Sequence, residues 1–287
     1  MTDPTTEAST TTENVCYRHP NRETFVKCQR CGRPICGQCQ TIAPVGVHCP
    51  ECVREGRQAS SRPITTRVAR AVAPGSSRPI VTWTLIAINV IVFIAELLTG
   101  NPIMGNGSGA VADALYFSPG DILYEPWTII TSAFVHANLI HIGLNMYSLF
   151  VLGAPLERYL GRIRYLVLYF IGAIGSSVGV ELLSQDGALG ASGAIFALLG
   201  FLVIFAPRVG FNRTWLVILG VINLGYGFVD PTIAWQGHLG GLVVGLLIGA
   251  LLYFTRAIRR HALQVAGLIV LPILLLITMF IHAVLTF

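Results

Sequence analysis

The sequence predicts an all-α polytopic membrane protein with a small cysteine-rich module in its N-terminal part. The chain of 287 residues is 53% hydrophobic and only 11% charged, whereas soluble domains carry about 25% charged residues. The polar and basic residues concentrate before residue 81, and long apolar runs follow them. All seven cysteines lie between Cys16 and Cys52, so no disulfide framework supports the apolar part.

Shifts in composition divide the chain into segments of different character. The first fifteen residues have neither a positive stretch nor an apolar run, so no cleavable signal peptide is expected. In chain order we predict a disordered tail (1–14), a cysteine-rich module (15–54), a basic flexible linker rich in Arg, Ser and Pro (55–80), a membrane core (81–256) and one additional C-terminal transmembrane helix (257–287).

Seven apolar segments are predicted to form the membrane helices. Several are shorter than the ~20 residues that a simple span needs. This predicts a thinned bilayer or helices that end inside a protein-lined cavity. The segments are 82–98, 138–155, 164–183, 191–206, 214–229, 235–255 and 264–286.

The basic residues between these segments predict their orientation. Arginines occur in the turns after the second, fourth and sixth segments, and neither Lys nor Arg occurs in the loops after the first, third and fifth. The positive-inside rule then places the N-terminus in the cytoplasm and the C-terminus outside. We expect a bacterial cell membrane. The formal charge of +5 reflects this topology, and no nucleic acid is expected as a partner.

Four polar residues inside the apolar segments need an explanation, because polar groups are costly in a bilayer. They occur in the second, fourth and sixth segments, which all run from outside to inside. At the rise of a helix, all four lie within roughly 10 Å of the outer interface. They are His141, Asn145, Ser192 and His238.

These residue types suit acyl-transfer chemistry. A serine hydroxyl is a weak nucleophile that needs an adjacent base, so Ser192 is the predicted nucleophile and His238 the predicted base. His141 and Asn145 are four residues apart and share one helix face, from which both can donate to an oxyanion. Free N–H groups at the start of the fourth helix can add to them. Taken singly, Ser192 could bond its own backbone and His238 could link two helices.

Glycines recur at every fourth position of the sixth segment. This spacing predicts close packing against another helix with small residues, and the fourth segment is the expected partner. Such packing would place His238 beside Ser192. The glycines are Gly237, Gly241, Gly245 and Gly249.

Four stretches of the membrane part form a specific combination, in this order: the H-x4-H-x3-N stretch His136–Asn145, the turn Leu156–Gly161, the GxSG motif Gly190–Gly193, and Gly237-His238 followed by spaced glycines. Through these stretches, the membrane part resembles the rhomboid family of intramembrane serine proteases over about residues 81–256.

This resemblance implies an active Ser192–His238 dyad without an aspartate, with His141 and Asn145 as oxyanion donors. It also implies that the substrates are transmembrane proteins, cleaved near their outer end. His136 is expected to have a supporting, hydrogen-bonding role. The seventh segment resembles the appended C-terminal helix of some rhomboids, and no special role is expected for His282 within it.

Two positions depart from the family pattern. Phe196 stands where rhomboids often have a Tyr that stacks on the catalytic His, so the stacking is expected to survive without the hydroxyl. Trp127-Thr128 stands where a Trp-Arg pair is common, and the missing Arg is expected to loosen the first outer loop. That loop, 99–137, could be a lid, a disordered segment or a loop half-submerged in the outer leaflet, and we favour the last.

The N-terminal module contains four pairs of metal-ligand residues. Eight such ligands suit two tetrahedral zinc ions. Disulfides are the alternative, against which a reducing cytoplasm argues, and an iron–sulfur cluster is disfavoured by His19. His48 lies next to Cys49 and could replace it as a ligand. The pairs are Cys16-x2-His19, Cys28-x2-Cys31, Cys36-x2-Cys39 and Cys49-x2-Cys52.

This pattern resembles B-box-type zinc fingers, which bind their ions in a cross-braced order. So short a module is expected to take its folding energy from the metal, with a small core of Phe25 and Val26. A cytoplasmic protein is the expected partner of the module. The resemblance implies one ion on Cys16, His19, Cys36 and Cys39, and the other on Cys28, Cys31, Cys49 and Cys52.

Three functions compete for this sequence. The first is a serine endopeptidase that acts on transmembrane helices. The second is a catalytically silent, rhomboid-like membrane adaptor that recruits a partner through its zinc module; the presence of both Ser192 and His238 favours the enzyme. The third, a small transporter, would need charged groups at the midplane of the bilayer, and the charged residues here lie at helix ends.

Overall fold

The computed structural model describes residues 14–43, 46–60, 78–105, 108–230, 232–255 and 261–287. The chain forms two compact units, Met1–Arg70 and Ala71–Phe287, whose boundary lies inside the predicted linker. That linker was expected from residue 55, whereas helix α1 (Pro50–Ser60) continues to Ser60. Residues 61–77, most of the predicted tail, and the basic turn at Arg256, Arg259 and Arg260 lie outside the described residues.

The N-terminal unit consists of short strands, turns and helix α1 around its cysteines. Strand β1 (Val15–Cys16) pairs antiparallel with β2 (His19–Glu23), and β3 (Thr41–Ile42) pairs antiparallel with β4 (Val47–His48). A 3-10 turn, η2 (Gly37–Cys39), lies between the two strand pairs.

The core predicted for this unit is wrong. Phe25 is 80% exposed and Val26 is 40% exposed, whereas Ile35 is fully buried. Ile35 and six of the cysteines form the interior, with Tyr17 and Val47 packed against them. A unit this small buries little surface, and the buried cluster is formed by Ile35 and the cysteines, without Phe25.

Each of the seven predicted apolar segments is a helix in the membrane unit. Six of the spans formed by the described residues are long and apolar enough to cross a membrane, whereas α10 has only 14 residues. The protein is therefore a multi-pass membrane protein whose membrane unit is all-α, as predicted. In chain order the helices are α3 (Ile80–Leu98), α6 (Leu139–Ser148) continued by the π-helical turn η5 (Leu149–Gly153) and α7 (Ala154–Leu160), α8 (Arg162–Leu183), α9 (Ser192–Val209), α10 (Arg213–Tyr226), α11 (Trp235–Phe254) and α12 (His261–Thr286).

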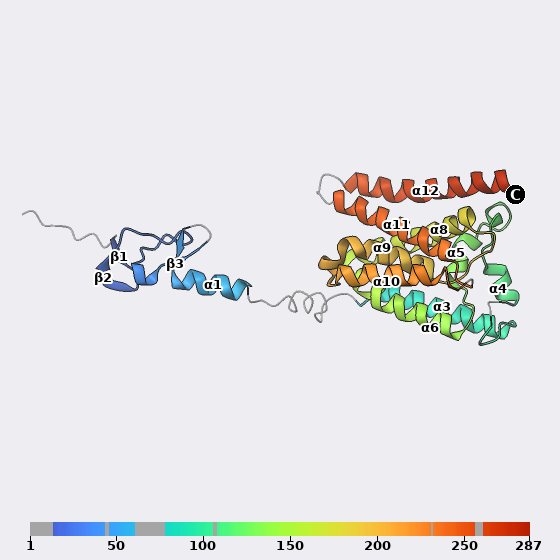
Figure 1. Cartoon of the computed structure of the whole chain (residues 1–287), viewed down its shortest axis with the longest axis horizontal. Helices are drawn as coiled ribbons and strands as arrows, with labels where there is room; N and C mark the ends of the chain where they lie inside the picture. The colour runs from blue at the N-terminus through green and yellow to red at the C-terminus, as the bar shows by residue number, and fades with distance from the viewer. Residues whose placement is uncertain (1–13, 44–45, 61–77, 106–107, 231, 256–260) are drawn as a thin grey trace, which may run out of the picture. The chain divides into compact units, whose positions relative to one another are not determined.

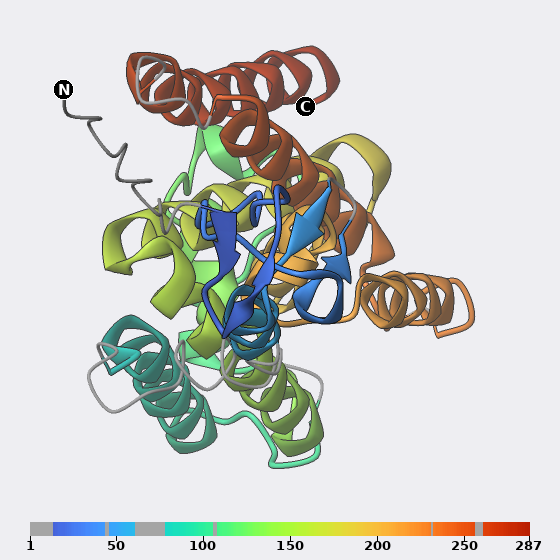
Figure 2. The ribbon, with the colours of Figure 1, turned by 90° about the vertical axis from the view of Figure 1, so that its left-hand side faces the viewer.

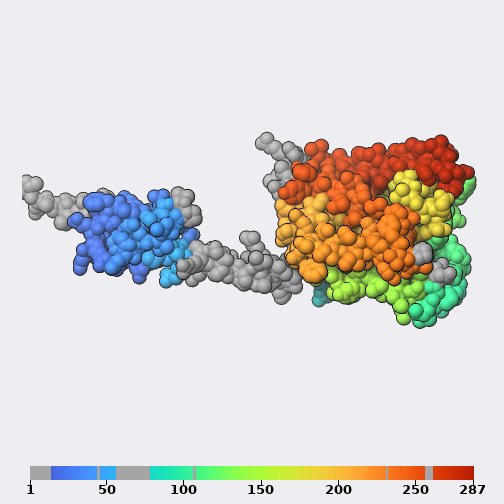
Figure 3. All heavy atoms as spheres, viewed as in Figure 1, coloured from blue at the N-terminus to red at the C-terminus, as the bar shows by residue number. Residues whose placement is uncertain are grey.

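Helix α9 lies at the centre of the membrane unit. It is the most buried of the candidate spans, and it contacts α8, α10 and α11. Figure 1 shows α12 along one edge of the unit and α3 and α6 along the opposite edge, and the end-on view of Figure 2 agrees. Helix α10 forms the surface that faces the viewer in Figure 3, and its buried residues are Leu216 and Gly220.

The spaced glycines of α11 let it pack closely on α9. A Cβ atom at Gly241 would collide with the carbonyl of Gly193, and one at Gly245 with the carbonyl of Ala197. The predicted contact between the fourth and sixth segments is thus confirmed. Close approach also extends to α8, where a Cβ at Gly240 would meet the carbonyl of Gly175, so α11 packs into the groove between α8 and α9.

The loop between α3 and α6 contains four short helical turns: α4 (Ala110–Leu115), η3 (Asp121–Leu123), α5 (Thr128–Thr131) and η4 (Ser132–Phe134). Thr128, where a looser loop was expected, is fully buried, and its hydroxyl donates to the Glu125 carbonyl at 2.7 Å. Trp127 Nε1 donates to the Ala114 carbonyl at 3.0 Å. The loop therefore has a defined internal structure, and its half-submerged position stays a prediction.

Glu157 of α7 caps the N-terminus of α3. Its Oε1 accepts from Val81 N at 3.0 Å, and its Oε2 accepts from Thr82 N and Thr82 Oγ1, both at 2.8 Å. The carboxylate is buried, with 2% of the residue exposed. A negative group at this place satisfies two free N–H groups and interacts favourably with the helix dipole.

We expect Glu157→Ala to destabilise the membrane unit by about 2–4 kcal/mol, because it leaves two buried N–H groups and a hydroxyl without acceptors. Thermal unfolding of the purified protein in detergent measures this loss. Glu157→Gln is the matched control, since it keeps one acceptor oxygen and should lose about half as much. Equal stability of Glu157→Ala and the wild type would show that the cap contributes nothing.

Candidate active site and metal centres

Ser192 and His238 meet between α9 and α11. Ser192 is the first residue of α9, and His238 lies in the first turn of α11. His238 Nε2 is 2.8 Å from Ser192 Oγ, which is hydrogen-bonding distance. The phenyl ring of Phe196, one turn after Ser192, stacks on the imidazole with centroids 4.3 Å apart and planes at 12°. The stacking predicted for Phe196 is confirmed.

The second imidazole nitrogen of His238 has no hydrogen-bond partner among the described residues. Its Nδ1 is buried, and no described group forms a hydrogen bond with it. Among the described residues, Ser192 and His238 therefore form a pair without a third, acidic member. The imidazole of His238 is oriented by its packing against Phe196 and not by a carboxylate. With Nδ1 protonated, Nε2 presents its lone pair to the serine hydroxyl.

Gly190 connects this pair to His141. Its φ of +111° is one that other residues rarely adopt, and its N–H donates to the Ser132 carbonyl at 2.9 Å. A Cβ at this position would lie 2.8 Å from His141 Nε2 and 3.8 Å from Ser192 Oγ. The backbone at Gly190 thus lies against the imidazole of His141, on the same side as the hydroxyl of Ser192.

Asn145 is buried on the same helix as His141. Its Nδ2 donates to the His141 carbonyl at 2.9 Å, which uses one of its two amide hydrogens. The second hydrogen remains for another acceptor. The structure therefore brings Ser192, His238 and His141 together, and it places Asn145 one turn further along α6.

A buried glutamate that the sequence analysis did not single out supports this region. Glu96, at the end of α3, is fully buried and accepts from His136 N at 3.1 Å. His136 Nδ1 lies 3.2 Å from the Phe134 carbonyl, and its ring contacts that of His141 edge-on at 5.1 Å. His136 thus packs behind His141, as its predicted supporting role requires. The signal for Glu96 was a lone acidic residue in an apolar run.

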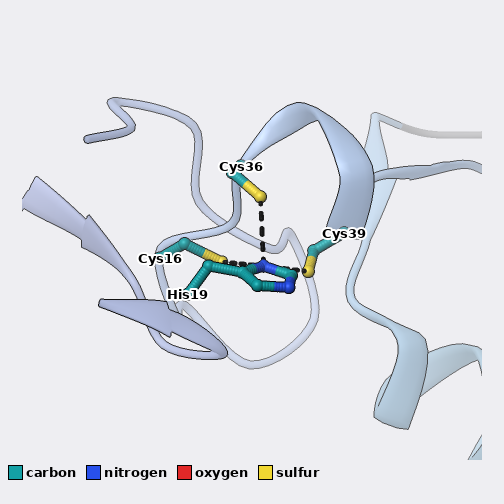
Figure 4. Close-up of side chains that lie close together, drawn as sticks. All are labelled: Cys16, His19, Cys36 and Cys39. Carbon is teal, nitrogen blue, oxygen red and sulfur yellow. Dashed lines mark hydrogen bonds between the residues drawn. The ribbon is translucent and has the colours of Figure 1, made fainter. Parts of the chain in front are cut away.

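The first cluster of metal-ligand residues gathers around His19. Its Nδ1 lies 3.7 Å from Cys16 Sγ and 3.4 Å from both Cys36 Sγ and Cys39 Sγ. Figure 4 shows the three sulfur atoms directed at this nitrogen. Strands β1 and β2 supply the first two residues, and the turn η2 supplies Cys39, with Cys36 just before it.

The second cluster contains Cys28, Cys31, Cys49 and Cys52, whose sulfur atoms all lie within 4.8 Å of one another. Cys49 belongs to this group, whereas His48 lies in β4 opposite Thr41. Arg33 Nε donates to Cys31 Sγ at 3.3 Å. This hydrogen bond from the guanidinium lowers the pKa of the Cys31 thiol to about 6, so the thiolate form that binds metal is present at neutral pH.

Both clusters fit a tetrahedral metal ion. Around zinc, with bonds of about 2.3 Å to sulfur and 2.0–2.1 Å to nitrogen, neighbouring ligand atoms lie roughly 3.6–3.8 Å apart. The Sγ–Nδ1 distances of 3.4–3.7 Å in the first cluster are close to this spacing, and the Cys31–Cys49 Sγ distance of 3.7 Å in the second falls within it. The two clusters have the membership that the cross-braced pattern implies.

These features define a class of protein: a multi-pass helical membrane protein with a serine–histidine pair between its spans and two metal-ligand clusters in a separate unit. Residues 124–256 match the family model described as the Rhomboid domain. This match lies within the membrane unit. The described residues of the N-terminal unit fall outside this match.

Relatives of known name agree with this family. The chain is 31% identical to Rhomboid protease GluP of Bacillus subtilis (strain 168) over 67% of its own length and 38% of that protein. It is 33% identical to RHOMBOID-like protein 1 of Arabidopsis thaliana, over 55% and 43%. It is 30% identical to Rhomboid protease GlpG of Yersinia pestis (strain Pestoides F), over 58% and 60%. The chain thus spans 38–60% of the length of these relatives. Their similarity supports an assignment of the membrane part to the rhomboid family.

Proposed function

We propose that this protein is an intramembrane serine endopeptidase that hydrolyses peptide bonds in or near the transmembrane helices of other membrane proteins. The observation that carries the proposal is the 2.8 Å contact between Ser192 Oγ and His238 Nε2 inside a bundle of apolar helices. The names of the relatives GluP and GlpG, both called rhomboid proteases, support the same activity.

In the proposed mechanism, His238 Nε2 takes the proton of Ser192 Oγ as the oxygen attacks the scissile carbonyl. The C–O bond forms, and the carbonyl π electrons move to the oxygen, which becomes an oxyanion. Collapse of this intermediate breaks the C–N bond while His238 returns the proton to the departing amine. Water, deprotonated by His238, then attacks the acyl carbon. The bond to Ser192 Oγ breaks, His238 returns the proton to that oxygen, and the second product leaves as a carboxylic acid.

The oxyanion needs hydrogen-bond donors that are already in place. The N–H groups at the start of α9 are free because the first turn of a helix has no internal acceptors for them. The His141 imidazole lies beside Gly190, next to Ser192, and Asn145 has a spare amide hydrogen. We assign these groups to the oxyanion site.

Both metal clusters are proposed to hold zinc, which supplies no step of the hydrolysis and acts as a structural ion in the N-terminal unit. We also propose that this unit lies in the cytoplasm and that the C-terminus lies outside, from the positions of the arginines. A protein partner of the unit stays a prediction.

Labelling with a fluorophosphonate probe tests the proposed activity. The probe forms a covalent bond only with an activated serine, so the detergent-solubilised wild type should be labelled and Ser192→Ala should not. Ser176→Ala is the matched control: Ser176 Oγ also lies near Gly193 and Gly237, between the same helices. A correctly folded wild type that resists the probe and leaves model substrates intact would favour the silent adaptor.

We expect Asn145→Ala to lower the turnover rate by about 10–1,000-fold, because it removes one oxyanion donor. Substrate binding should change little, since this donor acts mainly in the transition state. Steady-state kinetics on a reconstituted transmembrane substrate separate the two effects. Asn223→Ala is the control, because Asn223 makes the same bond to the carbonyl four residues before it, on α10. A defect confined to binding would place Asn145 outside the oxyanion site.

A further inference from the structure

Glu181 is a buried carboxylate near the end of α8 that joins three parts of the membrane unit. Its side chain is fully buried. Its Oε1 lies 3.0 Å from Nδ1 of His282 on α12, and its Oε2 accepts from the N–H of Gly120 in the first loop at 2.9 Å. A buried carboxylate is stable only when such partners replace its hydration. His282, for which no special role was expected from the sequence, therefore has a buried polar partner.

The end of α12 packs on the loop at the same place. Met279 and Ala283, on the face of α12 that also carries His282, are fully buried. The terminal residue Phe287 packs over Gly120, where a Cβ atom would lie 3.1 Å from the phenyl ring. Gly120 has a φ of +90°, so the loop makes a turn here that a residue with a side chain would rarely adopt.

Apolar packing also joins α12 to the loop. Met279 of α12 belongs to the same buried cluster as Phe117 and Ile129 of the loop, with Ile122 packed against it. An open apolar groove of about 520 Å³ lies beside this cluster, lined from the loop side by Ile122, Pro126, Ile129 and Ile130 and from α12 by Leu276, Ile277 and Phe280, with Ile174 of α8 beside them. The polar link through Glu181 and the ring of Phe287 therefore add to an apolar contact between the same elements.

The loop in turn supports the segment that carries Ser192. Phe117 and Ala188 exchange two backbone hydrogen bonds, of 3.4 and 2.9 Å, and Gly190 N donates to the carbonyl of Ser132. The loop segment from 117 to 132 thus holds the backbone immediately before Ser192 at two points. Gly120, which Glu181 holds, is three residues from the first of them.

We propose that His282 is a positioning residue for the active site. Through Glu181 it anchors the first loop to α8 and α12, and through that loop it fixes the backbone before Ser192. Helix α12 then helps to hold the active site in place. The proposal rests on the proposed protease function for its effect on turnover, whereas its structural part is independent of activity.

Hydrogen exchange in the full chain tests the structural part, in a Ser192→Ala background that has no turnover. His282→Leu removes the donor, and the amides of residues 117–124 should exchange about 10-fold faster. His282→Asn should restore slow exchange, because its amide nitrogen stands where Nδ1 stands. His282→Gln reaches further and should not restore it. Thr278→Val is the control, since this exposed hydroxyl bonds only the Leu274 carbonyl of its own helix.

Kinetics of the same variants with Ser192 intact test the positioning. His282→Leu should lower kcat by roughly tenfold with KM nearly unchanged, because misplacing a nucleophile affects the chemical step. His282→Asn should recover kcat. Exchange in His282→Leu at the wild-type rate, or no difference between His282→Asn and His282→Leu, overturns the proposed anchor. Faster exchange with unchanged kcat overturns the positioning role, and a wild type without activity refutes the protease function alone.

Discussion

Ser192→Ala is expected to reduce cleavage of a transmembrane substrate to background, a loss of at least about 10³-fold. Enzymes that depend on an activated serine lose this much or more when the nucleophile is removed. His238→Ala should lose activity to a similar degree, because the serine then has no base 2.8 Å from its oxygen. The double variant should be no worse than either single one, since the two residues act as a unit.

The measurement is the initial rate of cleavage in detergent and in reconstituted bilayers. Ser192→Ala keeps the Cβ at the start of α9, so its melting temperature should match that of the wild type. His238→Ala leaves a gap beside Phe196 and needs the same check. The Ser176→Ala control should cleave normally. If Ser192→Ala with an intact fold cleaves at the wild-type rate, the assignment of the nucleophile is wrong.

The second large effect concerns the metal. Protein purified under reducing, chelator-free conditions should carry close to two zinc ions per chain, since two clusters of four ligands each are present. Cys28→Ser together with Cys31→Ser should remove about one ion and unfold the N-terminal unit. The interior of this unit consists mainly of cysteines, so we expect its folding free energy to come largely from metal binding.

Metal analysis by mass spectrometry, beside cleavage kinetics on the same sample, tests this prediction. His48→Gln is the matched control, because Cys49 rather than His48 belongs to the second cluster, and both ions should remain. Activity in detergent should persist when the ions are lost, since the membrane part is a compact unit of its own. A metal content near zero in the wild type would refute the zinc assignment. Lost cleavage with an intact membrane fold would refute the independence of the two units.

The sequence alone determined the features that repeat locally or depend on composition. Apolar runs predicted all seven helices, because a chain in lipid must satisfy its backbone internally. The glycine spacing predicted that α11 packs on α9, since only small residues permit such an approach. The paired Cys and His residues predicted eight ligands, and the grouping of those ligands came from the resemblance to a known module.

The tertiary structure alone decided which distant polar groups meet. Glu157 caps α3 across a separation of 75 residues or more, and Glu181 meets His282 across 101. No periodicity links such positions, so a lone Glu or His in an apolar run shows that a partner is needed without showing which one. Burial in the N-terminal unit was also decided by the tertiary structure. Phe25 is more hydrophobic than any of the cysteines, yet its side chain is exposed. The cysteines are buried because the ligands of each cluster must converge on one point.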